Sequence, residues 1–269
     1  MAASQVVLDL GCGNRSFHYE TCPSRIVALD EQFVRKRIEQ EDPRIQYVLA
    51  RSQAIPLADS SIDAVVCHHT LEHFDDYKKA LAEIGRVLRP EGWLWIAIPN
   101  GYGFDDRLYR FVFAGGGHVN RFTREGLVKD VQTITGLTLV SMCDFFSSFI
   151  YLKKPSPSEL QYFPDFARRV TTLPNPLLSF AILLINFATR IMDKTLGHRS
   201  SQYGWGFVFS KTQMKVAKLA SCFNVCRKCG SGHPFDMMKR RPTIFGLGFY
   251  HCPNCKELNS LVAPPRGLD

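Results

Sequence analysis

Four cysteines near the C-terminus have the spacing of a metal site. Cys226 pairs with Cys229 and Cys252 with Cys255 in two Cys-x-x-Cys turns, and 22 residues lie between the pairs. Two such turns can bring four thiolates to the corners of a tetrahedron, which is the closed coordination of structural zinc. We therefore predict one structural Zn²⁺ bound by these four residues in a small tail that resembles a zinc ribbon. Iron in the same ligands is a less favoured alternative.

A second candidate site lies near the N-terminus, where an apolar run ends at two glycines. The run Val6–Leu10 contains one acid, Asp9, and Gly11-Cys12-Gly13 follows, which is typical of a buried strand that stops at a tight turn. The next apolar run ends in Asp30, where a doubly wound sheet binds the two hydroxyls of a ribose. Ser16 replaces the third glycine of the dinucleotide fingerprint, so the turn lacks a phosphate cradle. The expected ligand is a nucleoside without phosphate.

Several histidines could act as a general base. His68 and His69 come directly after the predicted fourth strand, at the sheet edge where open α/β folds bind ligands, and His73 follows them. His118 follows three glycines that could act as a hinge. An imidazole suits proton abstraction from an acceptor hydroxyl near neutral pH. We predict His69 and His118 as catalytic candidates, expect His73 to pack structurally, and predict no metal at these histidines.

The order of these and further motifs resembles that of the class I S-adenosylmethionine-dependent methyltransferases. The resemblance implies a Rossmann-like fold, S-adenosyl-L-methionine as cofactor and direct in-line transfer of its methyl group. Such a displacement needs no covalent help from the protein, so most of the catalysis is the positioning of the acceptor. The motifs that carry the resemblance are Asp9–Gly13, Asp30, Ala54–Val66, Leu71–Phe74 and Leu88–Leu94.

The resemblance also implies which residues bind the cofactor. The acid and glycines of the first motif would shape its methionine end, and Asp30 would bind its ribose. The family often has an acid after the third strand for the adenine amino group, but this chain has Arg51 there. We expect Ser52, Gln53 or a backbone carbonyl to serve that edge instead. The predicted cofactor-binding residues are Asp9, Gly11, Cys12, Gly13, Asp30, Ser52, Gln53 and His68.

Alternating apolar runs and amphipathic stretches predict the elements that position these residues. We predict an α/β fold with a Rossmann-like, seven-stranded, doubly wound sheet that is mostly parallel and has the antiparallel edge of the family. Between the glycines near 101–103 and 115–117 we expect a mobile segment. The predicted strands are 5–10, 25–29, 45–49, 61–67, 93–98, 137–146 and 203–209, and the predicted helices are 75–88 and 123–135.

An insertion of about 152–202 interrupts the last two predicted strands. It opens with a proline-rich linker signal and contains a helical candidate at 158–170 and an apolar run at 177–192. The run is shorter than the ~20 residues that span a bilayer. We favour a helix of the core or of a homodimer interface. The alternative is a helix that lies in a membrane surface, with basic residues on its flanks.

The chain of 269 residues is predicted to contain two domains. These are a methyltransferase domain at 1–221, which includes the insertion, and a zinc-ribbon-like domain at 222–269. Hydrophobic residues at 45% and charged residues at 22% are ordinary globular values. The first predicted strand begins at residue 5, and nine cysteines include four in a metal spacing. We therefore expect no signal peptide and a cytoplasmic protein, with peripheral membrane attachment as an option.

The predicted function is methyl transfer to an oxygen or nitrogen of a small-molecule, carrier-linked or lipid-linked acceptor. A formal charge of +8 and a pI near 9.1 would suit nucleic acid, anionic lipid or an acidic sugar. One alternative is an RNA or protein methyltransferase that docks its substrate on the ribbon. Nucleic acid is less favoured, because the ribbon shows only Lys239-Arg240-Arg241 as a basic cluster. Another alternative is a non-catalytic, cofactor-binding module whose ribbon recruits a partner.

Overall fold

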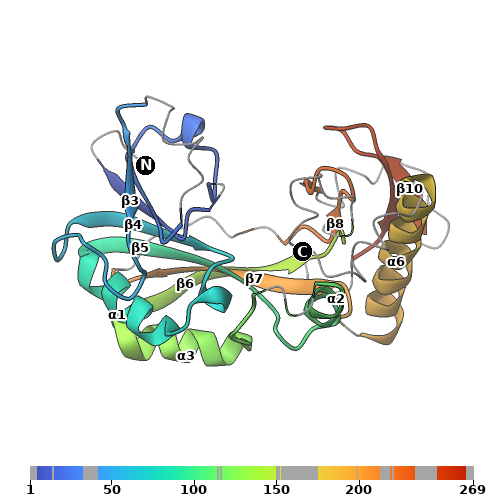
Figure 1. The fold of residues 1–269 in the computed structure, drawn as a ribbon. Coiled ribbons are helices and arrows are strands. Elements are labelled where there is room, and N and C mark those ends of the chain that lie inside the picture. The colour runs from blue at the N-terminus through green and yellow to red at the C-terminus, as the bar shows by residue number, and fades with distance from the viewer. Residues whose placement is uncertain are drawn as a thin grey trace. The chain divides into compact units, whose positions relative to one another are not determined.

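In the computed structural model of the chain, short runs rich in valine, isoleucine and leucine form a seven-stranded sheet with the order β3-β2-β1-β4-β5-β7-β6 (Figure 1). Strands β1 to β5 pair in parallel, and the sheet has one antiparallel edge. The predicted Rossmann-like, doubly wound sheet is confirmed. Its strands are β1 (Val6–Leu10), β2 (Arg25–Asp30), β3 (Ile45–Leu49), β4 (Ile62–His68), β5 (Leu88–Pro99), β6 (Thr138–Phe146) and β7 (Gln202–Ser210).

The chain forms two compact units. The first unit comprises Met1–Pro99, Val119–Met142 and Trp205–Leu219, and the second comprises Asn100–His118, Cys143–Gly204 and Ala220–Asp269. The predicted division into domains at 1–221 and 222–269 stays a prediction. The structure describes residues 5–13, 15–32, 42–113, 115, 117–149, 152, 175–197, 199–212, 219, 221–233 and 247–264.

Alternate residues of the central strands pack on opposite faces of the sheet, as the period of two in a strand requires. On one face, Leu8 and Leu10 are fully buried in the main core, which the helices α1 and α3 complete. On the opposite face, Val7 lies in a second buried cluster. The helices of the first unit are η1 (Tyr19–Thr21), η3 (Leu71–His73), α1 (Tyr77–Val87) and α3 (Arg124–Thr135).

Local signals fix the ends of α1 and α3, and both predicted helices are confirmed. The Asp76 carboxylate accepts a hydrogen bond from the Lys79 backbone N–H at 3.1 Å, which caps the N-terminus of α1. The Thr123 hydroxyl accepts one from the Gly126 N–H at 3.1 Å at the start of α3. Gly136 ends α3 in the left-handed conformation, with φ 69°. The N-cap residue of α1 directly follows Asp75, which lines the candidate site.

Two elements differ from the prediction. The segment expected to be mobile contains the helix α2 (Phe104–Val112), whose N-cap, Gly103, has no side chain to signal a helix start. Strand β5 begins earlier than predicted, because Leu88 already pairs with Ile62 across a register shift. Pro90 and Gly92, residue types that usually end a helix, therefore lie inside this strand.

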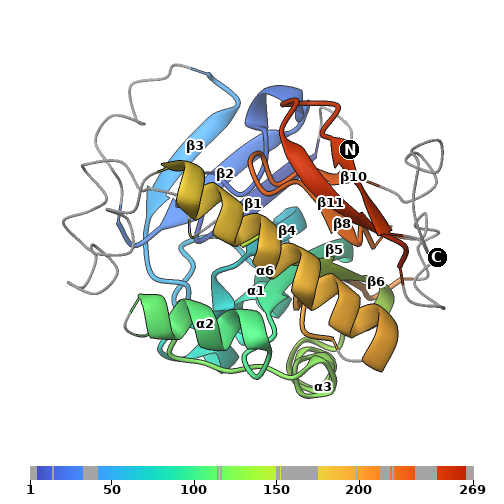
Figure 2. The same cartoon turned by 90° about the vertical axis from the view of Figure 1, so that its right-hand side faces the viewer.

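The second unit contains one long helix and two small antiparallel hairpins. Helix α6 is longer than the predicted apolar run at 177–192, and it lies alongside the hairpin of β10 and β11 (Figures 1 and 2). The helical candidate at 158–170 and the basic cluster at 239–241 lie outside the described residues. The elements are α6 (Asn175–Leu196), β8 (Asn224–Val225), β9 (Gly232–His233), β10 (Leu247–His251) and β11 (Leu258–Val262).

Candidate functional site

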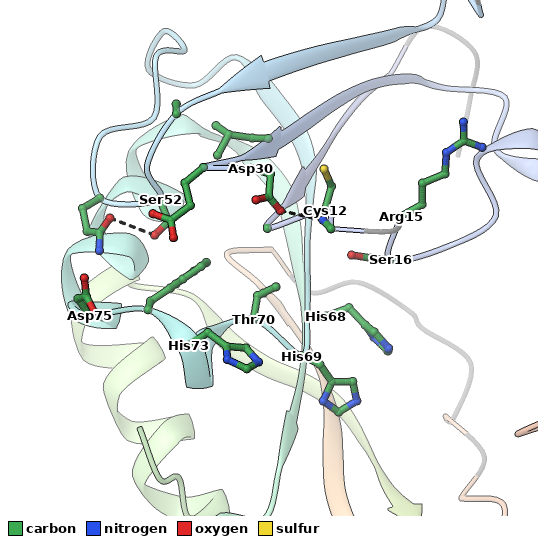
Figure 3. Close-up of a pocket in the computed structure, with 17 residues that line it drawn as sticks. Cys12, Arg15, Ser16, Asp30, Ser52, His68, His69, Thr70, His73 and Asp75 are labelled. Atoms are coloured by element: carbon green, nitrogen blue, oxygen red, sulfur yellow. Dashed lines mark hydrogen bonds between the residues drawn. The ribbon is translucent and has the colours of Figure 1, made fainter. Parts of the chain in front are cut away.

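A cavity of about 420 Å³ opens in the first unit at the carboxyl ends of β1, β2 and β4 (Figure 3). This is the edge at which open α/β sheets bind ligands, and the volume is in the range of small-molecule sites. Seven of the eight predicted cofactor-binding residues line it, all except Asp9. The lining residues are Gly11, Cys12, Gly13, Arg15, Ser16, Leu29, Asp30, Glu31, Ala50, Ser52, Gln53, His68, His69, Thr70, His73, Phe74 and Asp75.

Glycine is suited to the two positions of the turn after β1 for different structural reasons. Gly11 has φ 68°, and a Cβ built on it would lie 2.5 Å from Thr70 Cγ2, so only glycine fits against that side chain. Gly13 has φ 41°, but a Cβ there would meet nothing within 4 Å. The first glycine therefore allows close packing inside the protein. The second leaves open space beside the turn, where a ligand can approach the backbone.

Asp9 supports the turn from behind instead of lining the cavity. Its side chain is fully buried, and Oδ2 accepts hydrogen bonds from the Tyr19 hydroxyl at 2.6 Å and the Ser16 N–H at 3.0 Å. Burial raises the pKa of this carboxyl, and the two hydrogen bonds oppose that rise. Asp9 is not among the residues that line the cavity, and its buried Oδ1 has no hydrogen-bond partner among the described residues. The contact of Asp9 with the cofactor stays a prediction.

Asp30 joins the end of β2 to the glycine turn. Its Oδ2 accepts a hydrogen bond from the Gly13 N–H at 2.8 Å (Figure 3). Its Oδ1 accepts one from the Gln32 N–H at 3.0 Å. These bonds hold the carboxylate at the rim of the cavity. A carboxylate in this place can accept further hydrogen bonds from vicinal hydroxyls, since each oxygen has two lone pairs.

The loop after β3 supplies the opposite polar edge. Ser52 and Gln53 both line the cavity, and the Ser52 hydroxyl donates to Gln53 Oε1 at 3.3 Å. Arg51, at the position where the resembled family often has an acid, is exposed and is not among the lining residues. A hydroxyl and an amide thus stand where that acid would be, and they can donate to and accept from a heterocyclic edge.

Histidines gather along another edge of the cavity, after β4 (Figure 3). Burial, and then the neighbouring His69, lower the pKa of His68 to about 4, so its imidazole is neutral at physiological pH. The His69 ring packs edge-on against that of His68, with 4.6 Å between the centroids. His73 was expected to pack structurally, but it is exposed and lines the cavity.

A buried acid, which sequence reasoning did not single out, faces His69. Glu72 is 1% exposed, and its Oε1 lies 3.5 Å from His69 Nδ1. The backbone of His69 has φ 53°, an uncommon conformation for a residue with a side chain. Strained residues of this kind cluster at functional sites. Glu72 stood in the same motif as the histidines, but the sequence could not show which of them it would face.

His118 belongs to the second unit, where it pairs with a different acid. Its Nδ1 lies 2.8 Å from Asp106 Oδ1, and the Arg110 Nε donates to Asp106 Oδ2 at 2.5 Å. The Tyr109 ring stacks on the imidazole, with 4.8 Å between the centroids. Burial alone would raise the pKa of Asp106, but the hydrogen bonds from His118 and Arg110 outweigh it and lower that pKa. An acid held in this way orients the imidazole.

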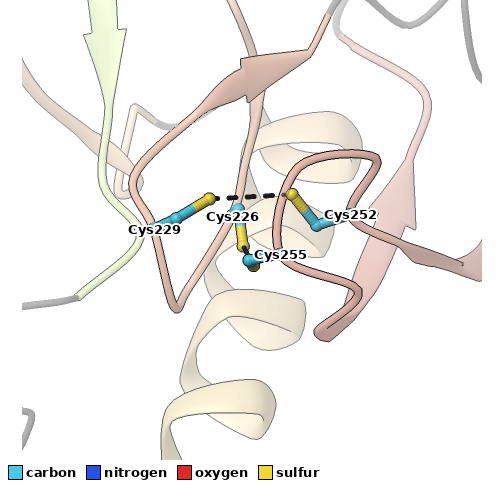
Figure 4. A group of neighbouring side chains, drawn as sticks. All are labelled: Cys226, Cys229, Cys252 and Cys255. Atoms are coloured by element: carbon cyan, nitrogen blue, oxygen red, sulfur yellow. Dashed lines mark hydrogen bonds between the residues drawn. The ribbon is translucent and has the colours of Figure 1, made fainter.

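The four predicted zinc ligands meet in the second unit (Figure 4). All four sulfur atoms lie within 4.8 Å of one another, with Cys226 and Cys255 3.5 Å apart and Cys229 and Cys252 3.6 Å apart. A tetrahedral site with Zn–S bonds of about 2.3 Å requires sulfurs about 3.8 Å apart. The Lys228 N–H also points to Cys226 Sγ at 3.4 Å, as backbone donors do toward a ligating thiolate.

Comparison with known proteins identifies similar chains. Residues 8–96 match the family described as Methyltransferase domain. Rv3030 of Mycobacterium tuberculosis, a protein assigned to the S-adenosylmethionine-dependent methyltransferases, is 30% identical over 149 residues, which cover 52% of this chain and 51% of the relative. The human thiol S-methyltransferase TMT1B is 34% identical over 119 residues, which cover 40% of this chain and 48% of the relative. The chain thus spans about half the length of the curated relatives it matches.

Solved structures share the fold at low sequence identity. Phosphoethanolamine N-methyltransferase 2 of Haemonchus contortus, solved with S-adenosylhomocysteine, aligns with a TM-score of 0.54 at 15% identity over 79% of this chain and 50% of its own. The YcgJ protein of Bacillus subtilis aligns with a TM-score of 0.50 at 17% identity over 77% of this chain and 91% of its own. Residues 8–96 are therefore similar in sequence to the methyltransferase domain, and the chain has the Rossmann-like fold of these methyltransferases.

Proposed function

We propose that this chain is an S-adenosyl-L-methionine-dependent methyltransferase. The observation that carries the proposal is that the segment similar to the methyltransferase domain, residues 8–96, also lines the cavity. It supplies the glycine turn, the Asp30 carboxylate and the histidine edge to one space. The names of the similar proteins support the same chemistry.

The described residues fit the cofactor. The open space beside Gly13 leaves room for the ligand at the turn, and the cavity of about 420 Å³ is in the range of small-molecule sites. Asp30 would bind the ribose hydroxyls, and Ser52 with Gln53 would bind the edge of the adenine. When bound, S-adenosyl-L-methionine supplies a methyl group on a sulfonium, which is electrophilic without further activation. The task left to the protein is to orient the acceptor and to move its proton.

His69 is the residue of this pocket best placed to accept that proton. Its side chain lines the cavity, and the Glu72 carboxylate faces its Nδ1 at 3.5 Å. A buried carboxylate on one ring nitrogen fixes the tautomer in which the other nitrogen can act as the base, and it stabilises the imidazolium that forms. His118, which Asp106 orients in the same way, is a second candidate base.

The acceptor is an oxygen or a nitrogen of a small-molecule, carrier-linked or lipid-linked compound. An O–H or N–H acceptor has a proton that a histidine can remove, which the imidazoles beside the cavity support. The alternative of an RNA or protein substrate docked on the cysteine-rich tail is tested by the same assay. Localisation in the cytoplasm is part of this proposal.

The cysteine cluster is proposed to bind one structural Zn²⁺. All four donors are thiols, so a tetrahedral ion would have no open position for a substrate, and its contribution would be to folding. The cluster joins the two short hairpins, β8–β9 and β10–β11, and Tyr250 and Leu261 are the other buried members of its apolar cluster. Natural folds of fewer than about 70 residues often add a structural metal to a small core.

The test is transfer of labelled methyl from S-adenosyl-L-methionine to separate pools of small metabolites, lipids, RNA and proteins by the full chain. Gly13→Val is the control, since its side chain would fill the space beside the turn. We expect label in one pool only, small-molecule or lipid, and none with the control. Label in RNA or protein would assign the acceptor to that class. Tight cofactor binding with no transfer to any pool would contradict the enzyme and favour the non-catalytic module.

A further inference from the structure

Helix α6 presents a continuous apolar face to solvent. Exposed side chains recur every three or four residues from Leu177 to Leu196, with the exposed Ala188 between Leu184 and Met192, so they lie along one stripe of the helix. Figure 2 looks onto α6, which stands in the foreground of that view. No acidic or basic residue interrupts the stripe. We define the α6 stripe by Leu177, Phe180, Leu184, Met192 and Leu196, which are 60%, 58%, 50%, 41% and 63% exposed.

The polar side chains of α6 point the other way, into the second unit. Arg190 is 2% exposed and donates from Nε to the Phe223 carbonyl at 2.8 Å. Asn186 donates to the Ser148 carbonyl at 3.0 Å. Asp193 Oδ2 accepts from the Ser201 N–H at 3.0 Å. The inward side of α6 also buries Leu178 and Ile182, so the helix is apolar on both sides and has its charged groups inside. The usual surface helix of a soluble protein instead presents its charged residues to solvent.

Helix α2, in the same unit, likewise exposes apolar side chains and buries its acidic ones. Phe104 and Phe111 are 47% and 69% exposed, and they lie three and four residues from Arg107, which is also exposed, on one face of the helix. Asp105 and Asp106 are only 7% and 2% exposed. The outward face of α2 is thus aromatic and basic, and its acids are inside.

Among the described residues of the second unit, the exposed charges are all positive. Its acids are buried or half-buried, and Asp144 and Glu257 face Arg199 and Arg227 respectively. The exposed ionic side chains among these residues are basic, and the formal charge of the whole chain is +8. An anionic surface complements this unit. These exposed bases are Arg107, Arg199, Lys228 and Lys256.

We infer that the second unit docks on an anionic lipid bilayer through the α6 stripe. The stripe from Leu177 to Leu196 is about 30 Å long and about 10 Å wide, which gives about 300 Å². A stable protein interface needs about 800 Å² per partner, so the stripe is too small to hold a second copy by itself. A two-fold contact would also bring the same positive surfaces together. Binding to a bilayer needs no minimum interface area and brings no like charges together. The free energy of burying the apolar stripe and the attraction of the basic side chains to anionic lipid both favour it.

The helix lies on the bilayer and does not cross it. Among the described helices, α6 alone is long and apolar enough to span a membrane by length and composition, from Pro176 to Leu196. However, Arg190 and Asp193 are both 2% exposed and hydrogen-bonded to other segments of the unit. Removal of the helix from the unit would leave these charged groups without partners in hydrocarbon.

Flotation of the full chain with vesicles tests this docking. The vesicles contain phosphatidylcholine alone or phosphatidylcholine with phosphatidylglycerol, and we expect stronger binding to the second kind. The test variant is Phe180→Gln with Leu184→Gln. The matched control is Leu49→Gln, which removes a leucine that is 69% exposed on β3, in the other unit. Both variants change exposed positions, so both should fold, and unchanged circular dichroism and thermal unfolding of the full chain check that they do.

The exposed areas of Phe180 and Leu184 together equal about the area of one apolar side chain, which docking on the bilayer would bury. Loss of that burial in the double variant should weaken vesicle binding about 10- to 100-fold. Leu49→Gln should leave it unchanged. Arg107→Gln should weaken binding to phosphatidylglycerol vesicles about fivefold and leave binding to phosphatidylcholine unaffected. Failure of the full chain to float, or equal flotation of the double variant and the wild type, would overturn the inference.

Two further measurements show whether the α6 stripe binds a bilayer or a second copy of the chain. In Phe180→Trp, brominated lipids should quench the new indole beyond any quenching of the wild type, whose three tryptophans all belong to the first unit. Light scattering without vesicles should give a monomer for both the wild type and the double variant. A dimer that the double variant splits would assign the stripe to a second copy and overturn the membrane proposal.

Discussion

The two glycines of the turn after β1 should respond differently to alanine. Gly11 and Gly13 have φ 68° and 41°, so an alanine at either position costs about 1–2 kcal/mol of backbone strain. At Gly11 the new Cβ would also lie 2.5 Å from Thr70 Cγ2, and overpacking of this kind costs about 1–3 kcal/mol. Gly11→Ala should therefore lower the free energy of unfolding by about 2–5 kcal/mol, and Gly13→Ala by about 1–2 kcal/mol.

Urea unfolding followed by tryptophan fluorescence measures both losses, because the native tryptophans belong to the first unit. A double-mutant cycle of Gly11→Ala with Thr70→Gly isolates the crowding, and its coupling energy should be about 1–3 kcal/mol. A cycle that pairs Gly13→Ala with Thr70→Gly should give a coupling energy near zero, because a Cβ at Gly13 contacts nothing within 4 Å. Equal losses for the two single variants, or no coupling between Gly11 and Thr70, would refute the packing reason given for the first glycine.

Three further predictions concern other groups. Asp30→Asn should weaken S-adenosyl-L-methionine binding by calorimetry by about 1.5–3 kcal/mol, since the carboxylate is a charged acceptor; unchanged affinity would remove it from the ribose site. Asp106→Asn should cost about 3–5 kcal/mol of stability at pH 7. Because the folded pKa of Asp106 is lowered, that contribution is present above its unfolded pKa of about 3.9 and is lost as pH falls through the folded value. Cys229→Ser should abolish zinc binding in metal analysis and unfold the hairpins without loss of cofactor affinity; a full zinc equivalent would contradict the assignment.

The sheet and its ligand edge could be predicted from the sequence because their signals are local. An apolar run followed by Gly11 and Gly13, or by Asp30, shows where a strand ends, and parallel strands bring those ends together. Helix α3 was equally clear, since Thr123 and Gly136 mark its two ends. By contrast, α2 begins at a glycine without a capping side chain, so no local signal separated it from a mobile loop.

Long-range partners could not be predicted in the same way. The sequence shows His69 and His118 as possible bases, but not that Glu72 faces the first and Asp106 the second, because those contacts depend on packing. The apolar run of α6 posed a similar problem. Hydropathy shows how apolar a helix is, whereas its orientation depends on where Arg190 and the other inward side chains find hydrogen-bond partners.

The most direct test of the central claim is calorimetric titration of the full chain with S-adenosylhomocysteine, beside the Gly13→Val variant. This nucleoside keeps the ribose and adenine that Asp30, Ser52 and Gln53 are proposed to bind. The account predicts one binding site per chain for the wild type and no binding for Gly13→Val, with the variant still folded. No heat of binding to the wild type, or equal affinity for both proteins, would contradict the assignment of this pocket.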